Sequence, residues 1–358
     1  MMIRNPEDIL FETSDVDGRA NCLNSLFSDR QVPVCHLTRL NKWLSQSLSR
    51  VALIFFLLTT FNVQADEDFP PELTQFSPSE RNPIFTAAGP DHWDVKIRER
   101  GWILREGDQW KMWYTGYDGT RPGQKMLGYA TSTDGFVWQR YPKNPIYSEH
   151  WVEDVCVIPH DGLYYMFAEG VEDRAQLLTS RDGISWNRVG RLDVRLVNGE
   201  KIPDGPYGTP TAWFESGQWN LFYERGDRGI WLARSSDTKV FTNVQDEPVM
   251  QPGPESYDYN QIAMNQIIRH KGRYYAIYHG ARKPEDPTQS SLWSTGIATS
   301  TDLIHWKKFA GNPLRPIAEN KSSGLLIYDG DHFRLYTTHN EVNVHLPKVV
   351  KTPLIQNH

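Results

Sequence analysis

Cysteine is scarce in this sequence, and the common zinc-binding patterns are missing. The 358 residues include three cysteines, Cys22, Cys35 and Cys156, and neither a Cys-x-x-Cys nor a His-Glu-x-x-His pattern occurs. Only Cys156 would remain after removal of the leader described below, so no internal disulfide can form in the mature chain. We therefore expect a domain stabilised by its apolar core, and we assign no metal ligands.

A basic surplus and long helical patterns are missing as well. Lys and Arg number 38 against 44 Asp and Glu, a formal net charge of −6, which argues against a nucleic-acid partner. After residue 70 no apolar stripe with a period of 3.6 residues continues for three turns, which argues against a helical fold. Aromatic residues reach 12%, and they suit both β-strands and surfaces that stack on sugars.

The first 65 residues differ from the rest and are excluded from the predicted fold. Three basic residues between positions 39 and 50 precede an apolar run, Val51–Phe61, which is followed by the small-x-small sequence Val63-Gln64-Ala65. This order is typical of a signal peptide and predicts export to the periplasm or the cell exterior. The alternative is a membrane anchor. The run is shorter than the roughly 20 residues that span a bilayer, so we expect no stable membrane association.

One short turn pattern recurs along the chain. Its copies are Thr131–Trp138, Thr179–Trp186, Thr299–Trp306 and the degenerate Arg234–Phe241. Asp-Gly is a tight-turn dipeptide, and the copies are spaced as the blades of a propeller are. We interpret the unit as the hairpin between the third and fourth strands of a blade, and its aspartates as turn formers rather than catalytic groups.

A second unit, a turn followed by an aromatic strand, occurs five times. Its copies are Gly107–Tyr114, Asp161–Phe167, Ser216–Tyr223, Lys271–Tyr278 and Asp329–Tyr336. Each copy predicts the hairpin between the first and second strands of a blade. The sequence therefore predicts an all-β fold, a five-bladed β-propeller.

A third unit ends the blades and predicts how the ring closes. It occurs at Asn144–Tyr147, Glu247–Met250 and Asn312–Leu314, and a further copy, Asn82–Phe85, precedes the first blade. The fifth blade lacks an outer strand of its own, so we expect Asn82–Phe85 to complete it and to close the ring. The predicted domain covers residues 66–345, and residues 346–358 form a tail.

Blade geometry also identifies candidate functional residues. In an antiparallel blade the first strand starts, and the second strand ends, at the same mouth of the central channel. The first-strand starts contribute Trp93, Asp94, Asp154, Asp204, Tyr207 and Asp258. The second-strand ends contribute Glu169, Glu224, His279 and His339. This mouth is richer in acidic, imidazole and aromatic side chains than a purely structural one.

Carboxylates beside aromatic rings are what glycosidic cleavage requires. One carboxyl group donates a proton to the leaving oxygen, and another activates water or attacks the anomeric carbon. A third charge can adjust the pKa of the acid, while aromatic rings and a basic residue such as Arg100 can hold the sugar. The alternative for each carboxylate is a turn cap or a surface ion pair, and Glu153 and Glu172 fit that alternative best.

The blade phrases resemble those of five-bladed glycoside hydrolases. Lys111–Asp118, Leu127–Gly135 and Asn144–Tyr147 carry the likeness, which covers about residues 82–340. The families are glycoside hydrolase families 43 and 62, 32 and 68, and the more distant 117 and 130. The resemblance implies an aspartate on blade one as base or nucleophile, which Asp94 matches. It also implies a second aspartate on blade two that orients and tunes the pair, which Asp154 matches.

The proton donor departs from the family pattern. The resemblance implies a glutamate at the start of the first strand of blade three, but Tyr207–Trp213 contains none. Glu224 ends the partner strand at the same mouth and is our first choice for the acid. Asp204 and Glu169 are alternatives, and the likeness to family 117 adds His279.

Several functions fit these residues. The leading hypothesis is an exo-acting glycosidase on plant or algal oligosaccharides. A phosphorylase similar to family 130 would need basic residues for phosphate, for which Arg98, Arg100 and Arg225 are candidates. A non-catalytic sugar-binding propeller and, less favoured, a polysaccharide lyase are further alternatives. No cofactor is required, although an ion could occupy the central channel, and the expected partner is an oligosaccharide or polysaccharide.

Overall fold

The computed structural model describes residues 67–98, 100–120, 122–282, 284 and 288–348. All of them belong to one compact unit, Asn62–His358. The predicted leader, residues 1–65, lies outside the described residues, so export stays a prediction. Within the described ranges, no helix is both long and apolar enough to cross a membrane. The helical elements are short: α1 (Pro71–Thr74), η1 (Ser256–Asp258) and η2 (Ile317–Glu319).

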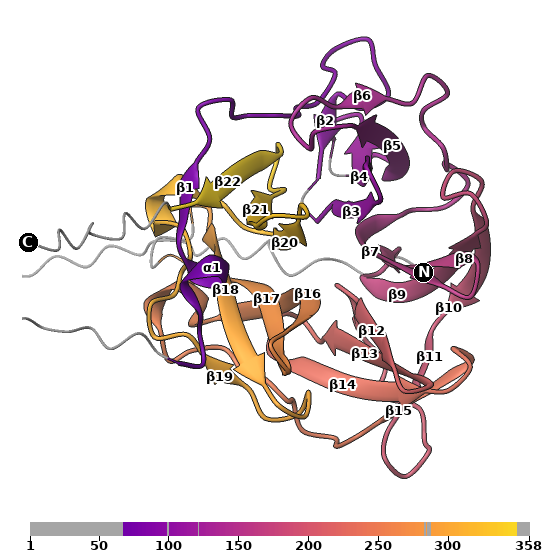
Figure 1. The fold of residues 1–358 in the computed structure, drawn as a ribbon. Helices are drawn as coiled ribbons and strands as arrows, with labels where there is room; N and C mark the ends of the chain where they lie inside the picture. The colour runs from indigo at the N-terminus through magenta and orange to yellow at the C-terminus, as the bar shows by residue number, and fades with distance from the viewer. Residues whose placement is uncertain (1–66, 99, 121, 283, 285–287, 349–358) are drawn as a thin grey trace, which may run out of the picture. The chain divides into compact units, whose positions relative to one another are not determined.

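Five small β-sheets form a five-bladed propeller, as predicted (Figure 1). Blade one comprises β2 (Lys96–Ile97), β3 (Trp102–Glu106), β4 (Gln109–Tyr117), β5 (Met126–Ser132) and β6 (Gln139–Arg140). Blade two comprises β7 (Glu153–His160), β8 (Leu163–Gly170), β9 (Arg174–Ser180) and β10 (Asn187–Arg191). Blade three comprises β11 (Asp193–Arg195), β12 (Thr211–Glu215), β13 (Gln218–Glu224), β14 (Ile230–Ser235) and β15 (Val240–Asn243).

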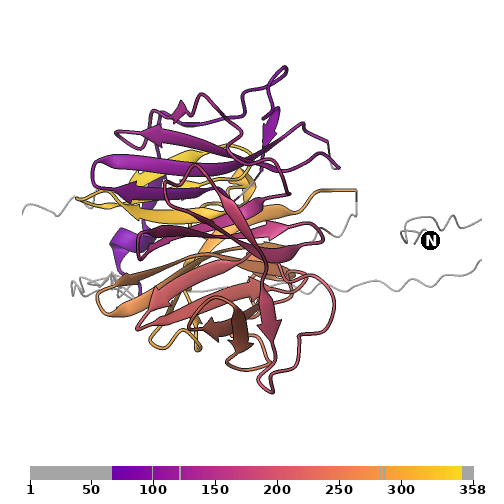
Figure 2. The ribbon, with the colours of Figure 1, turned by 90° about the vertical axis from the view of Figure 1, so that its right-hand side faces the viewer.

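The last two blades complete the ring. Blade four comprises β16 (Gln261–His270), β17 (Arg273–Arg282), β18 (Leu292–Ser300) and β19 (Lys307–Lys308). Blade five comprises β20 (Gly324–Tyr328), β21 (Phe333–Thr337), β22 (Asn343–Pro347) and the N-terminal β1 (Phe76–Pro78). The inner strands β3, β7, β12, β16 and β20 contact one another in ring order around the channel, and Figure 2 shows the same blades from the side.

The repeated turn aspartates form the hairpins, as expected. Asp182 Oδ1 accepts hydrogen bonds from the backbone N–H groups of Ile184 at 2.8 Å and Ser185 at 2.7 Å. These bonds to the charged form, led by the bond from Ser185, lower the pKa of Asp182 to about 2. Asp134 and Asp302 make the same pair of bonds. The Asp–turn unit is therefore structural.

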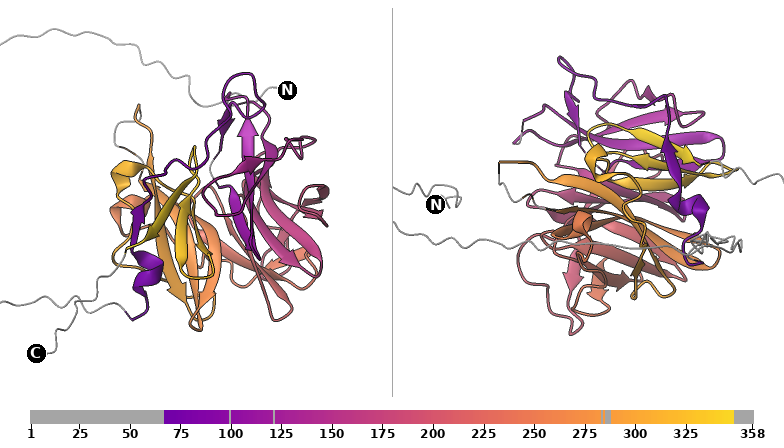
Figure 3. Two further views of the ribbon diagram at one scale, coloured as in Figure 1. Left: turned by 45° about the horizontal axis from the view of Figure 1, so that its top comes forward. Right: turned by 90° about the vertical axis from the view of Figure 1, so that its left-hand side faces the viewer.

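The N-terminal segment closes the ring through blade five. Strand β1 pairs antiparallel with β22 (Figure 3), so the closing strand lies slightly before the predicted Asn82–Phe85. Asn82 nevertheless binds β22: Val344 N–H donates to its Oδ1, and its Nδ2 donates to the Val344 carbonyl, both at 2.8 Å. Asn144 holds Tyr129 of its own blade by the same two bonds, each 2.9 Å long. The repeat therefore serves blade five from the other end of the chain.

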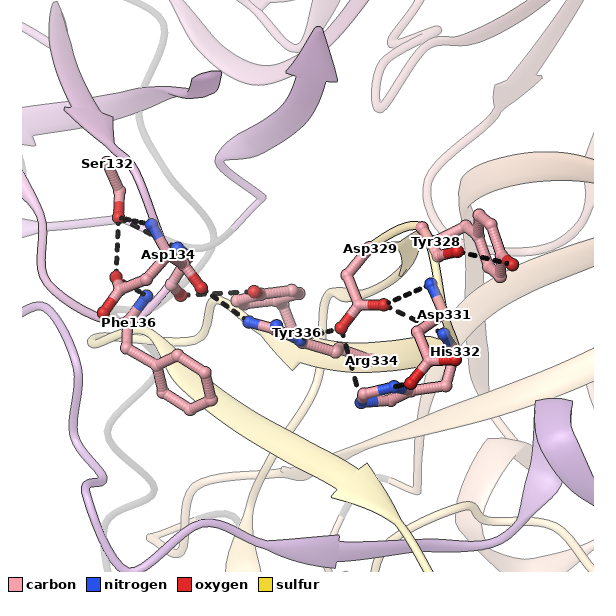
Figure 4. Close-up of polar contacts among 11 residues, drawn as sticks. Ser132, Asp134, Phe136, Tyr328, Asp329, Asp331, His332, Arg334 and Tyr336 are labelled. Carbon is pink, nitrogen blue, oxygen red and sulfur yellow. Dashed lines mark hydrogen bonds and ion pairs between the residues drawn. The ribbon is translucent and has the colours of Figure 1, made fainter. Parts of the chain in front are cut away.

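Side-chain contacts join blade five to blade one (Figure 4). Arg334 donates to the Asp134 carbonyl and to the Asp329 carboxylate, both at 2.7 Å. The Tyr336 hydroxyl donates to the Gly135 carbonyl at 3.2 Å. Turn residues of blade one thus accept hydrogen bonds from the second strand of blade five, which fixes the seam where the ring closes.

Aromatic rings fill much of the space between blades. Trp113 is fully buried, and its ring lies 5.6 Å from that of Tyr129, 5.9 Å from that of Tyr164 and 6.3 Å from that of Trp186. Each such buried ring contributes on the order of 2 to 3 kcal/mol through its apolar area. Many of the abundant aromatic residues therefore belong to the core rather than to a sugar-stacking surface.

Candidate functional site

A pocket of about 210 Å³ opens where the first strands begin and the second strands end. Its lining contains five carboxylates, which are Asp154, Glu169, Asp173, Glu224 and Asp227. Arg98, Thr209, His279, Trp293 and Ser323 contribute to the rest of the wall. We call this cavity the carboxylate pocket. It is small beside the roughly 300–1,000 Å³ of typical ligand pockets, so it suits a single sugar ring.

Gly208 and Thr209 hold two of the glutamates side by side. The Gly208 N–H donates to Glu224 Oε1 at 3.1 Å, and the Thr209 N–H donates to Glu169 Oε2 at 2.8 Å. A Cβ on Gly208 would lie 2.1 Å from that oxygen of Glu169 and 3.0 Å from that oxygen of Glu224, so the two oxygens are no more than about 5 Å apart. Asp227 N–H also donates to Glu224. Sequence reasoning missed this backbone clamp.

A β-bulge places Asp154 at the same pocket. The register of β7 against β8 shifts between Glu153 and Cys156, and Asp154 within the bulge has a φ of 52°. Bulges re-aim side chains at the rims of sheets and near active sites. Thr209 Oγ1 lies 3.4 Å from Asp154 Oδ2 and 3.3 Å from Glu169 Oε2. One threonine hydroxyl therefore links the aspartate to the glutamate pair.

Burial makes both glutamates harder to ionise. Desolvation, followed by the charge of Asp227, raises the pKa of Glu224 to about 7. Desolvation, followed by the charge of Asp154, raises the pKa of Glu169 well above its ordinary value. A buried carboxyl group loses hydration of its charged form, and neighbouring carboxylates add repulsion. At neutral pH the pocket can therefore hold a protonated glutamate beside an ionised carboxylate.

Arg100 is buried and interacts through its charge with Asp154, Glu169 and Glu224. Its side chain is among the largest fully buried ones, and its Nη2 donates to the Pro210 carbonyl at 3.2 Å and to Thr211 Oγ1 at 3.0 Å. Asp154 is the carboxylate that most strongly favours the charged guanidinium. Arg100 therefore anchors the strand start that follows the Gly208–Thr209 clamp, instead of standing free to hold a substrate.

His279 and His339 reach the site in different ways. His279 lines the carboxylate pocket, and its Nδ1 bonds Asn265 Oδ1 at 2.7 Å. Asn265 lies at the bulge in β16, another feature that the sequence did not indicate. His339 Nδ1 lies 2.9 Å from Ser322 Oγ, and it is Ser322 that lines the pocket. His339 thus supports the wall from behind.

Asp94 and Asp258 do not line the carboxylate pocket, contrary to expectation. Asp94 is buried and accepts hydrogen bonds from the Tyr114 hydroxyl at 3.3 Å and from Arg140 Nε at 3.2 Å. Asp258 is buried in the corresponding place of blade four and accepts one from Lys308 at 2.6 Å. A buried aspartate paired with a cation on an outer strand thus recurs in two blades. This repetition favours a structural role for both aspartates, and their part in activity stays a prediction.

The other expected residues are distributed around the mouth. Trp93 packs on Tyr114 with ring centroids 5.7 Å apart, away from the pocket lining. Tyr207 is buried, and its hydroxyl donates to the Leu192 carbonyl at 3.0 Å, so it faces a neighbouring cavity. Asp204 lines that cavity too. Blade geometry therefore predicted the mouth at which the carboxylate pocket lies, but not which side chains line that pocket.

Two further acidic residues differ in exposure. Glu153, expected to be solvated, is buried and accepts hydrogen bonds from Arg98 Nε at 2.8 Å and from Trp151 Nε1 at 2.6 Å. Glu172 is exposed, as expected. In the described part of the chain, no group of three or more His, Cys, Asp or Glu side chains could hold a metal ion. A channel ion therefore stays a prediction.

Comparison with known proteins places this geometry in context. No family model matches the chain. A 1,2-β-oligomannan phosphorylase from Thermoanaerobacter is 29% identical over 168 residues, which cover 43% of this chain and 53% of that protein. An uncharacterized protein from Mycobacterium tuberculosis is 27% identical over 199 residues, covering 50% of this chain and 66% of that protein. The match thus spans about half to two thirds of these relatives.

Solved structures share the fold at low sequence identity. A glycosyl hydrolase from Bacteroides ovatus superposes with a TM-score of 0.61 at 17% identity, covering 77% of this chain and 94% of the other. The β-1,2-mannobiose phosphorylase of Listeria innocua gives 0.59 at 16% identity, covering 76% and 96%. The fold is that of the five-bladed propeller glycoside hydrolases. A third structure comes from glycoside hydrolase family 130, which is described as a family of mannoside phosphorylases that contains hydrolases of β-1,2-mannosidic linkages. It superposes with a TM-score of 0.60 at 15% identity, covering 77% of this chain and 95% of the other.

Proposed function

We propose that this propeller is an exo-acting glycoside hydrolase whose carboxylate pocket binds the terminal sugar of an oligosaccharide. One observation carries the proposal: Glu169 and Glu224 are held on adjacent backbone N–H groups, beside Asp154, in a pocket the size of one sugar ring. Such a cluster provides both a proton donor and a base.

The two glutamates do not flank a sugar from opposite faces. Their clamped oxygens are at most about 5 Å apart and bind consecutive residues, Gly208 and Thr209. Acid and base therefore come from the glutamate pair and from Asp154. Arg100 favours the ionised form of Asp154, while the pKa of Glu224 is raised to about 7. We assign Glu224 as the proton donor and Asp154 as the carboxylate that activates water.

A phosphorylase is the second candidate, because the Thermoanaerobacter relative bears that name. The charges of the pocket favour hydrolysis over phosphorolysis. The three basic residues expected for phosphate already have partners. Arg98 lines the pocket, but its Nε bonds Glu153 at 2.8 Å, and Arg225 bonds the Pro203 carbonyl at 2.7 Å. Arg100 is buried against the Pro210 carbonyl and Thr211 Oγ1. Acidic side chains outnumber Arg98 in the lining even when a glutamate is protonated, which disfavours a phosphate dianion.

The test is product release from a panel of oligosaccharides by the full chain, with and without inorganic phosphate. β-Linked manno-oligosaccharides come first because the named relatives act on them, followed by plant and algal oligosaccharides. We expect a free monosaccharide from one class without phosphate, and loss of that product in Glu224→Gln. A folded protein that releases nothing from the whole panel would contradict the proposal and favour the sugar-binding alternative.

The assignment of acid and base has its own test. Activated aryl glycosides with good leaving groups need little proton donation. Glu224→Gln should therefore keep much more activity on them than on natural linkages, while Asp154→Asn should lose both. The reverse pattern would exchange the two roles.

A further inference from the structure

A second cavity adjoins the carboxylate pocket at the same mouth. It measures about 330 Å³ and is lined by β9, β10, β11 and the 201–207 loop. Its three cations are Arg174, Arg191 and Lys201, and we call it the basic cavity. Only a thin backbone wall separates the two, because Tyr207 N–H bonds the Asp173 carbonyl at 2.9 Å. Asp173 faces one side of this wall, and Arg174 faces the other.

The cations of the basic cavity are weakly compensated. Glu172 pairs with Arg191 at 3.0 Å and lies 3.5 Å from Arg174, but its side chain is 60% exposed, so water screens these pairs. Arg174 Nε is the buried atom that faces Glu172 at 3.5 Å, and it makes no hydrogen bond to a described residue. Of the two lining aspartates, Asp193 is held by Arg195 at 2.8 Å. Lys201 is exposed at the rim.

The floor of the basic cavity suits a sugar ring. Tyr207 is buried with its hydroxyl bound to the Leu192 carbonyl, and Val194 and Ile202 complete an apolar surface. Ligand sites commonly combine such a floor with a few charged groups that fix orientation. Arginine in particular recognises planar carboxylate and sulfate oxygens through paired N–H donors.

We propose that the basic cavity binds an anionic substituent, the carboxylate of a uronic acid or a sulfate ester, on the sugar next to the one held in the carboxylate pocket. The inference rests on the proposed function. Acidic side chains outnumber basic ones in the lining of the carboxylate pocket, which disfavours an anion there, so we expect the released sugar to be neutral. Its neighbour must pass over the Asp173–Tyr207 wall, where the charge changes sign. The substrate class is therefore an oligosaccharide with a neutral terminal sugar and an anionic second sugar.

Calorimetric titration of the full chain tests the inference without requiring turnover. The probes are glucuronate, glucose 6-sulfate and uncharged glucose, each at low and at high salt. We expect the anionic probes to bind at least about tenfold more tightly than glucose at low salt, and high salt to reduce that preference. Preference for glucuronate alone would identify a carboxylate site, and preference for the sulfate alone a sulfate site.

Variants locate the effect. Arg174→Gln combined with Lys201→Gln should abolish the anion preference, whereas Arg181→Gln should retain it. Arg181 is exposed just beyond the opposite end of β9, so it controls for the loss of a positive charge outside the cavity. Equal binding of charged and neutral probes, or a preference unchanged in the double variant with an unchanged melting temperature, would overturn the inference. Because binding is the readout, a failure of hydrolysis leaves this result interpretable.

Discussion

Gly208 lies so close to Glu169 that a side chain at this position would displace the carboxylate. A Cβ there would come within 2.1 Å of Glu169 Oε2. The backbone of Gly208 needs no left-handed conformation, so contact alone selects glycine. We predict that Gly208→Ala folds but loses at least about 100-fold in kcat/KM, roughly 3 kcal/mol of transition-state stabilisation.

Gly107→Ala is the matched control for that substitution. Gly107 has a φ of 59°, and a Cβ there would meet no atom within 4 Å. It should therefore lower the melting temperature while leaving kcat/KM unchanged. If Gly208→Ala kept wild-type kcat/KM, the clamp would have no catalytic importance.

The raised pKa of Glu224 predicts a specific pH dependence of stability. Folding moves this pKa from 4.5 to about 7. Between these values the unfolded chain releases the proton that the folded chain retains, so wild-type stability falls as the pH rises through this window. The free energy of unfolding of Glu224→Gln, taken relative to that of wild type, should therefore increase by up to roughly 3 kcal/mol between pH 4.5 and 7.5. Urea unfolding at both pH values measures this difference.

An exposed glutamate provides the control for the pH experiment. Glu247→Gln, at an exposed position, should show the same stability difference from wild type at both pH values. A Glu224→Gln curve parallel to that of wild type across the window would contradict the raised pKa. In activity assays the same group predicts a fall of kcat/KM above about pH 7.

Replacement by asparagine should affect mainly stability at Asp94 and mainly turnover at Asp154. Asp94→Asn weakens a buried pair with Arg140 and should destabilise the fold by roughly 3 kcal/mol, while the folded fraction keeps its kcat. Asp154→Asn should abolish turnover at modest cost in stability. Urea unfolding combined with kcat values corrected for folded fraction separates the two. Loss of kcat in a fully folded Asp94→Asn would restore Asp94 as a catalytic candidate.

Arg100 should influence the pocket in two ways, by holding the backbone next to the clamp and by favouring the ionised form of Asp154. Arg100→Met removes a buried positive charge that interacts with Asp154, and it removes the bond to the Pro210 carbonyl. The pKa of Asp154 should then rise, which moves the acidic limb of the kcat/KM profile to higher pH. Arg100→Lys keeps the positive charge, so the acidic limb of its kcat/KM profile should lie at the wild-type pH. Its kcat/KM should still be lower than that of wild type. Profiles that coincide with wild type would contradict this role.

The fold could be predicted from the sequence because the repeated units that indicate it are local. Five hairpins repeat recognisable turns, and Asn82 makes the bonds that Asn144 makes in its own blade. Strand ends also predicted the mouth at which the carboxylate pocket lies. The sites of Asp154 and Asn265 depend on bulges, and that of Thr209 on a φ of 47°. These features have no local sequence signature, so the clamp could not be foreseen.

The difference between the expected and the observed place of Asp94 has a similar origin. A side chain at the start of a first strand can face either a pocket or the space between strands. The choice depends on Arg140, which lies 46 residues further along the chain. The equivalent pair of Asp258 and Lys308 shows that a repeat of structural contacts can imitate a repeat of functional positions.

The most direct test of hydrolysis is the source of the oxygen on the released sugar. The enzyme would be incubated with its best oligosaccharide in ¹⁸O-labelled water containing inorganic phosphate, and the products analysed by mass spectrometry. A carboxylate pocket that activates water predicts free sugar carrying one ¹⁸O at its anomeric carbon, at a rate independent of phosphate. A sugar 1-phosphate formed in proportion to phosphate, without labelled free sugar, would contradict the account.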